Sequence, residues 1–348
     1  MSLINRYIML HILPACGMVL AVILGLDLLL AVSDEAEAVD RGASFSQVLT
    51  YVAYTAPYRA YQFMPLVLLV GALIGLGNLA NSNELTVMRA AGVTLRRLSF
   101  GALLAIGPLV AMNTLIGEYL VPWSQQMALL ERSEYRGVSS GKGFWLRDGE
   151  AYVYVSAVAP DNSLRGIHRY DFDSQVWHAS LFAKSAQQSN GNWQLLDGRT
   201  LGVGDLEVVT DTFEEKVWPV NLSTDLVAKL GMEPKYLSAT DLGEYVNYLE
   251  AAGINADLFN LAYWKKALQP LFTLSLVLVA MSFVFGSQRA VPTGQRVLFG
   301  VLTGLGFNYA QEILGPASSI FGFSPVVAYS LPILLCLLVA WRLFRRVN

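Results

Sequence analysis

Residues 81–92 read NSNELTVMRAAG and lie between two apolar runs, each long enough to cross a bilayer. An Asn or Ser side chain at 81–83 can cap the free N–H groups that begin a helix. Glu84 then lies in the first turn, beside the positive end of the helix dipole, and Gly92 can close the last turn. Because such a helix has only about two and a half turns and is polar, it is expected to lie outside the bilayer.

This short helix is amphipathic. Its apolar face is made by residues at helical spacing, which become smaller along the helix: Leu85, Met88, Ala91 and Gly92. Glu84 and Arg89 are free to point elsewhere. The pattern favours a helix that lies in a groove of another protein.

The composition indicates an integral membrane protein. The chain of 348 residues is 54% hydrophobic and only 15% charged, which is too apolar for a soluble enzyme of this size. Six apolar runs are long enough to span about 30 Å of hydrocarbon, and they begin near Ile8, Gln62, Leu98, Leu268, Val297 and Pro325. The first run is too long for the apolar core of a signal peptide and lacks a cleavage site, so we expect it to be retained.

The six predicted spans fall into two groups of three, in residues 1–121 and 263–348. Residues 122–262 between them are richer in charge, Trp, Tyr, Asn and Gly, and we expect them to form a separate domain. Arginines in the segments assigned to the inner side greatly outnumber acids, which places both termini in the cytoplasm. They are Arg6, Arg89, Arg96, Arg97, Arg289, Arg296, Arg342, Arg345 and Arg346. The central domain is then external.

The external domain has the period-two pattern of β-strands from Phe144 onward. Asn190-Gly191 is a hairpin signal, and several short strands joined by tight turns favour an antiparallel sandwich or jelly roll. Residues 241–251 predict an amphipathic helix capped by Ser238 or Thr240. The fold class is therefore an α-helical polytopic membrane protein, with three spans on each side of an inserted all-β domain.

Catalytic motifs are absent from the sequence. The only histidines are His11, His168 and His178, and neither HExxH nor GxSxG occurs. Cys16 and Cys336 lie inside predicted spans, where burial is the ordinary fate of a free cysteine. No metal-ligand cluster and no phosphate-binding loop is found, so no cofactor is expected and any energy source must lie in another subunit.

Charged residues inside the spans are costly and therefore informative: Asp27, Arg59, Glu118 and Glu312. Gln311 and Glu312 belong to a polar stripe that begins at Asn308. The stripe predicts either a polar contact between packed helices or a face that lines a cavity or a moving interface.

Four arginines near the outer ends of the first three spans could meet an anionic headgroup, because a guanidinium group pairs with phosphate in a bidentate way. They are Arg41, Arg59, Arg132 and Arg136. The alternative is salt bridging to Glu131, Glu134 or lipid.

The order of these elements resembles that of the lipopolysaccharide export permeases of the LptF/LptG type, over nearly the whole chain. Further similar stretches are 5–8, 117–122, 263–270 and 285–297, and the last of these, with Leu314-Gly315-Pro316, is more similar to the LptG branch.

The resemblance implies a bacterial inner-membrane subunit of an ABC transporter that extracts lipopolysaccharide. Its implied partners are an LptF-like paralogue, two copies of an LptB-like cytoplasmic ATPase that binds the ATP, an LptC-like bitopic protein beside the first span, and an LptA-like periplasmic bridge. The residues implied to couple to the ATPase are Glu84, Leu85, Met88, Arg89, Ala91 and Gly92.

The resemblance also implies that the first, second and fifth spans line a lipid cavity. Phe63 would contact the lipid, and Arg132 matches a basic family position near the headgroup. The family's lysines at the outer end of the first span are replaced here by residues 31–37, AVSDEAE, so Arg41 or Arg59 would substitute for them.

Two other classes of function are compatible with parts of the sequence. A membrane anchor could present the β domain to envelope partners without transport. An intramembrane enzyme would have to use Asp27, Glu118 and Glu312, since no other acids lie in the spans.

Overall fold

The computed structural model describes residues 3–40, 43–136, 143–159, 163–173, 176–189, 192–203, 208–220, 231–285 and 293–345. The chain divides into two compact units. The helical unit comprises Met1–Asp34, Thr55–Val121 and Phe259–Asn348. The β unit comprises Glu35–Tyr54 and Pro122–Leu258.

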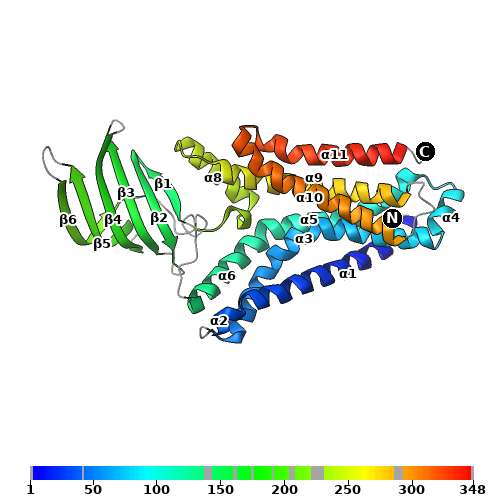
Figure 1. Ribbon diagram of the computed structural model, residues 1–348, viewed down its shortest axis with the longest axis horizontal. Helices are drawn as coiled ribbons and strands as arrows, with labels where there is room; N and C mark the ends of the chain where they lie inside the picture. Colours follow the sequence, from blue (N-terminus) through cyan, green and yellow to red (C-terminus); the bar gives the residue numbers. More distant parts are fainter. Residues whose placement is uncertain are drawn as a thin grey trace. The chain divides into compact units, whose positions relative to one another are not determined.

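The helical unit consists mainly of long helices. They are α1 (Leu3–Asp34), most of α3 (Phe45–Asn81), α5 (Leu95–Leu115), α9 (Asp257–Phe285), α10 (Thr293–Phe321) and α11 (Pro325–Arg345), with the short α4 (Glu84–Ala90) and the π-helix η1 (Ile116–Leu120). The start of α1, the end of α11 and α4 lie at one end of this unit (Figure 1). Three of the predicted inner segments, at the start of α1, at α4 and at the end of α11, therefore lie at one end of the helical unit, and the one that holds Arg289 lies outside the described residues.

Five helices of the described chain are long and apolar enough to cross a membrane: Leu3–Asp34, Phe45–Asn81, Leu95–Arg132, Asp257–Phe285 and Pro325–Arg345. The fifth predicted span corresponds to α10, which has 29 residues but is not among those five. Asn308, Gln311 and Glu312 interrupt its apolar residues. Within the described residues, five of the six predicted spans are therefore matched by helices that are long and apolar enough to cross a membrane.

The first half of α1 packs very closely on α3 because α3 presents two glycines one turn apart. A Cβ atom on Gly75 would lie 2.8 Å from the carbonyl oxygen of His11 and 2.9 Å from the Cα of Ile12. A Cβ atom on Gly71 would lie 2.8 Å from the Cα of Cys16. This is the arrangement by which small residues let two membrane helices approach.

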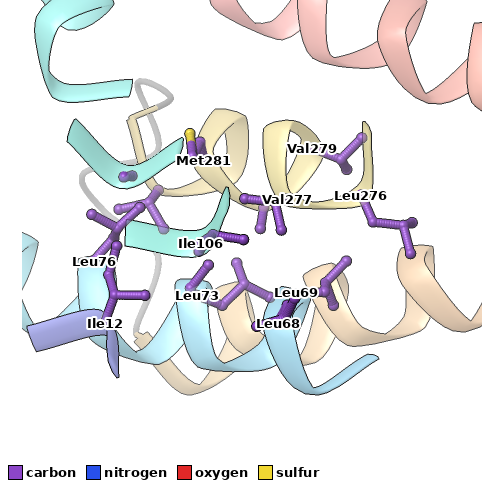
Figure 2. Close-up of a cluster of buried hydrophobic side chains, with 14 of the residues drawn as sticks. Ile12, Leu68, Leu69, Leu73, Leu76, Ile106, Leu276, Val277, Val279 and Met281 are labelled. Atoms are coloured by element: carbon purple, nitrogen blue, oxygen red, sulfur yellow. The ribbon is translucent and has the colours of Figure 1, made fainter. Parts of the chain in front are cut away.

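The core of the helical unit is aliphatic and centred on α3 and α9 (Figure 2). Leu68, Leu69 and Leu73 of α3 face Leu276 and Val277 of α9, and all five side chains are almost fully buried. Ile12 of α1 and Ile106 of α5 extend the same cluster. α3 is therefore the central helix of this unit.

The β unit contains one six-stranded antiparallel sheet in which each strand pairs with the next in sequence. The strands are β1 (Phe144–Asp148), β2 (Ala151–Val158), β3 (Leu164–Asp173), β4 (Val176–Ser189), β5 (Asn192–Val203) and β6 (Val208–Trp218). β5 follows the predicted Asn190-Gly191 hairpin and runs through Asp197, which has a φ of 50°. The unit also holds the helices α2 (Ala36–Asp40), α6 (Val121–Arg136, all but its first residue), η2 (Pro234–Tyr236) and α8 (Ala239–Ala251).

The inserted antiparallel β domain is confirmed, but its described strands follow a simple meander. A jelly roll needs Greek-key crossings between two sheets, and the order of β1 to β6 has none. Tight turns are the physical reason: Asp148 pairs with Ala151 across a two-residue turn in which Gly149 has a φ of 63°. Consecutive strands thereby become hydrogen-bonded neighbours.

The helix predicted after the sheet is α8, and Ser238 is its cap. The backbone N–H of Asp241 donates to the Ser238 hydroxyl oxygen over 2.9 Å. Leu242, Tyr245 and Leu249 make the buried face of the helix. Of the two caps considered from the sequence, the structure selects Ser238.

Candidate functional site

α4 is a seven-residue helix with no side-chain cap at its first end and a glycine that closes its last turn. Asn83 occupies the N-cap position with a φ of 61°, and its side chain makes no capping hydrogen bond, contrary to expectation. Gly92 has a φ of 90°, which favours glycine, and its N–H donates to the Arg89 carbonyl oxygen over 3.0 Å. Closure of the helix by Gly92 is therefore as predicted, whereas the side-chain cap is wrong for Asn83.

The two large residues on the predicted apolar face of α4 turn toward the chain's own core. Leu85 is 6% exposed and belongs to the aliphatic cluster of the helical unit, and Met88 packs against that cluster. Arg89, Ala91 and Gly92 are exposed. The two large residues of the predicted apolar face therefore anchor α4 to its own bundle, whereas its small residues, Ala91 and Gly92, do not pack there.

Val87 is the large apolar side chain that α4 presents outward, and it is 66% exposed. Sequence reasoning missed it because it does not share the spacing of Leu85 and Met88. An aliphatic residue outside the spacing of Leu85 and Met88 on a short polar helix was the available signal. Val87 and Ala91, one turn apart, are both exposed and together offer a small apolar surface.

Glu84, the first residue of α4, is joined to α1. The hydroxyl of Tyr7 donates a hydrogen bond of 2.6 Å to Oε2 of Glu84. This hydrogen bond is the main cause of the lowered pKa of the Glu84 carboxyl. A hydrogen bond with Ser82 and the nearby His11 lower the pKa further, whereas desolvation raises it. Glu84 is therefore a carboxylate at neutral pH.

Three of the predicted lipid-binding residues of the helical unit are ion-paired or packed within it. Arg59 Nη1 lies 2.6 Å from Asp27 Oδ2 of α1, and its Nε donates to the Thr55 hydroxyl oxygen. Glu312 of α10 accepts a 2.6 Å hydrogen bond from Lys265 of α9. Phe63 is half-buried against the aliphatic core.

Gln311 of α10 is the fourth predicted lipid-binding residue of the helical unit. Its side chain is buried, whereas that of its neighbour Glu312 is half exposed. The polar stripe of α10 thus has one residue turned inward and one turned outward. The Lys265 contact agrees with the interpretation of the stripe as a polar contact between packed helices, and the interpretation as a face of a cavity or moving interface stays a prediction.

Arg132 belongs to the β unit. Its Nη2 lies 2.8 Å from Oε1 of Glu35, and its guanidinium group lies over the ring of Tyr51 at 5.3 Å. Its Nε is buried without a hydrogen-bond partner. Arg41 lies outside the described residues, and Arg136 is described only as the last residue of α6.

A polar cluster around Tyr61 was not singled out from the sequence. The Tyr61 hydroxyl donates to Gln269 Oε1 of α9, and the Lys266 ammonium lies 5.5 Å from the Tyr61 ring centroid. Asn113 of α5 donates from Nδ2 to the Tyr61 carbonyl oxygen over 3.5 Å. The isolated polar residues in apolar runs were the signal, and together they tie α3, α5 and α9.

The described residues contain no group of three or more His, Cys, Asp or Glu side chains that could hold a metal ion. His168 lies on β3 between the rings of Tyr154 and Phe182, as the strand reading implies. Cys16 and Cys336 are buried free thiols.

Membrane-length helices, an inserted β domain and a short exposed helix between two spans define a polytopic membrane protein. The sequence model of the family described as "Lipopolysaccharide export system permease LptF/LptG" matches residues 6–346. The chain therefore belongs to this family of membrane permeases.

Two relatives named lipopolysaccharide export system permease protein LptG illustrate the similarity. The Haemophilus influenzae protein is 30% identical over 355 residues, which cover 99% of this chain and 98% of that protein. The protein of Escherichia coli K12 is 32% identical over 305 residues, or 85% of each chain. Both names agree with the predicted likeness to the LptG branch.

Proposed function

We propose that this chain is a permease subunit of an ABC transporter that extracts lipopolysaccharide from the inner membrane and passes it to a periplasmic bridge. The LptF-like paralogue, the LptB-like ATPase dimer, the LptC-like protein and the LptA-like bridge are its proposed partners. Family membership supports the substrate, and the exposed surface of α4 carries the coupling role.

α4 suits a docking role because its two sides differ. Leu85 and Met88 hold it on the bundle, while Val87 is 66% exposed and Arg89 and Ala91 are exposed too. An exposed apolar side chain, on a helix fixed to its own bundle by other residues, is suited to a protein interface. The ATPase would bind Val87, Arg89 and Ala91 and push α4 as a body.

The lipid would enter between helices of the membrane part, with its phosphates attracted to arginines. Arg59 and Arg132 each have a carboxylate partner, Asp27 and Glu35. A phosphate group would therefore have to share or replace that carboxylate. Phe63, Gln311 and Glu312 are the further proposed contacts, along with Arg41 and Arg136.

The β unit has a surface suited to apolar parts of a lipid. A pocket of about 510 Å³ opens on the sheet and is lined by Trp145, Tyr152, Tyr170, Phe172 and Ile254. Its lining is aromatic and aliphatic, so it offers contact area without hydrogen bonds. This supports a role of the domain in guiding lipid toward the bridge.

Co-purification tests the coupling surface. The chain is expressed with its paralogue and the ATPase, either unaltered or with Val87→Asp. We expect the substitution to remove the ATPase from the complex, because a carboxylate would be buried in an apolar interface. Val209→Asp is the matched control, since Val209 is 61% exposed on β6. Retention of the ATPase by Val87→Asp would contradict this docking surface, and absence of any complex with the unaltered chain would favour a non-transporting anchor.

A further inference from the structure

The contact between Tyr7 and Glu84 joins two segments that lie 77 residues apart. Tyr7 lies near the start of α1, and Glu84 is the first residue of α4. The bond is short, at 2.6 Å, and its acceptor is charged, which makes it stronger than a bond between neutral groups. It attaches α4 to a helix that does not adjoin it in sequence.

The ring of Tyr7 is held in place by His11, one turn further along α1. The two ring centroids are 4.5 Å apart, and His11 Nδ1 lies 3.0 Å from the Tyr7 carbonyl oxygen. Because a carbonyl oxygen only accepts, Nδ1 carries the proton in this bond. The contact of the Tyr7 ring with His11 therefore does not involve the hydroxyl, which donates its hydrogen bond to Glu84.

α1 has an anchored half and a largely exposed half. Ile8, Ile12, Cys16 and Val19 are buried, whereas Ala31 is the one buried residue of α1 beyond them. The anchored half packs on the glycines of α3 at His11 and Cys16. The exposed half is tied to α3 by the ion pair between Asp27 and Arg59.

We propose that Tyr7 is a positioning residue of the coupling step, whose hydroxyl holds the Glu84 carboxylate to α1 so that displacement of α4 by the ATPase moves α1. The movement of the anchored half is carried to the exposed half, where the pair of Asp27 and Arg59 lies. This inference rests on the proposed function, because it requires an ATPase that acts on α4.

A double-mutant cycle tests this role in the full complex with the paralogue and the ATPase, reconstituted in proteoliposomes with lipopolysaccharide. The variants are Tyr7→Phe, Glu84→Ala and the two combined, and the measured quantity is lipid released per ATP hydrolysed. Tyr7→Phe keeps the ring beside His11 and removes only the hydroxyl.

We expect Tyr7→Phe to keep the ATPase bound and to lower lipid release per ATP about tenfold, the factor that loss of a charged hydrogen bond can give. The combined variant should be no worse than Glu84→Ala alone, because the tyrosine acts through Glu84. Tyr119→Phe, at a tyrosine that is 72% exposed, should leave release unchanged.

Normal release by Tyr7→Phe, or losses that multiply in the combined variant, would overturn the role of Tyr7 while leaving the proposed function intact. Failure of the unaltered chain to bind the ATPase would overturn the proposed function, and the coupling role with it. A second measurement uses this chain alone: infrared titration should show a higher pKa for Glu84 in Tyr7→Phe. An unchanged pKa would also overturn the inference, whereas a merely structural role of the ring predicts no change.

Discussion

α1 and α3 are the two longest helices of the described chain, and their burial is opposite to what their hydropathy suggests. α1 has the more apolar sequence, yet only 17% of its most apolar stretch is buried, against 67% for α3. In water the more apolar helix would be expected at the centre. In a bilayer the lipid chains are as apolar as leucine, so hydropathy places a helix in the membrane without placing it in the core.

The difference in burial between α1 and α3 follows from the contacts that each helix makes with its neighbours. α3 presents Gly71 and Gly75 to α1 and a row of buried leucines to α9. α1 buries one face of its first half, against α5 and against α3 at His11 and Cys16, and is further held by the hydrogen bond of Tyr7 and the ion pair of Asp27. Its second half therefore contributes little to the core of the helical unit.

The largest expected effect breaks the close approach itself. Gly75→Leu would force a side chain against the backbone of His11 and Ile12, so we expect it to lower the free energy of unfolding by about 3 kcal/mol. Gly25→Leu is the control, because a Cβ atom there meets nothing within 4 Å. Denaturant titration in detergent micelles measures both, and equal effects would mean that α1 does not pack through this glycine.

Core truncation in α3 should cost less. Leu68→Ala leaves a cavity among fully buried side chains, and we expect it to lower the free energy of unfolding by about 2 kcal/mol. This is at the low end for such changes, because the unfolded helices remain in an apolar detergent or lipid environment. Leu26→Ala on α1, where the leucine is 60% exposed, should stay within about 0.5 kcal/mol of the unaltered chain. The same titration compares the two variants. A similar loss at both sites would remove the contrast between the helices.

Removal of the ion pair that ties α1 to α3 should have a smaller effect. Asp27→Ala leaves the Arg59 guanidinium with the Thr55 hydroxyl but without its carboxylate, and we expect a loss of about 1 kcal/mol because both groups are partly exposed. Asp34→Ala, at the exposed end of α1, is the control. Thermal unfolding in micelles distinguishes them, and a neutral Asp27→Ala would show that this pair does not hold the helix.

The smallest effect concerns pH and the contact of α1 with α4. The pKa of Glu84 is lowered, first by the Tyr7 hydrogen bond, so the stabilisation is complete above the ordinary carboxyl pKa of 4.5. It is lost as the pH falls through the lowered folded-state value. We expect the protection of the α4 amides against hydrogen exchange to fall over that acidic range in the unaltered chain. In Tyr7→Phe, which lacks the bond, protection should already be lower at neutral pH and should depend less on pH, and coincident profiles would show that the bond does not stabilise α4.

Much of the fold could be predicted because its signals are local. Membrane-length apolar runs, period-two strands and the Ser238 cap depend on nearby residues, and long helices and strands of the structure cover them. The helix α6 was not predicted, and α3 begins at Phe45, well before the predicted start near Gln62. The sheet order could not be read in the same way, because strand pairing depends on how each turn closes. The side chain of Asn83 failed as a cap because its backbone is left-handed, which no residue type requires.

The sequence named the helix of the candidate site but not the side of that helix that is exposed. The sequence pointed to the helix of Glu84, Met88 and Gly92, and the structure places it at one end of the helical unit (Figure 1). Which side of the helix is exposed depended on the bundle beneath it. An apolar face packs equally well on its own chain or on a partner, so periodicity alone cannot distinguish Leu85 from Val87 as the outward residue.

Hydropathy, strand period and family motifs are properties of the chain, so they were enough to predict a membrane permease of the LptF/LptG family with a β domain inserted between two groups of helices. The central place of α3, the peripheral place of α1, the outward Val87 and the contact of Tyr7 with Glu84 became visible only in three dimensions. These are contacts between residues far apart in the chain. Their geometry follows from close packing at glycines and from hydrogen bonds. The spacing of Gly71 and Gly75 marks a small-residue face on α3, but it does not say which helix packs on that face.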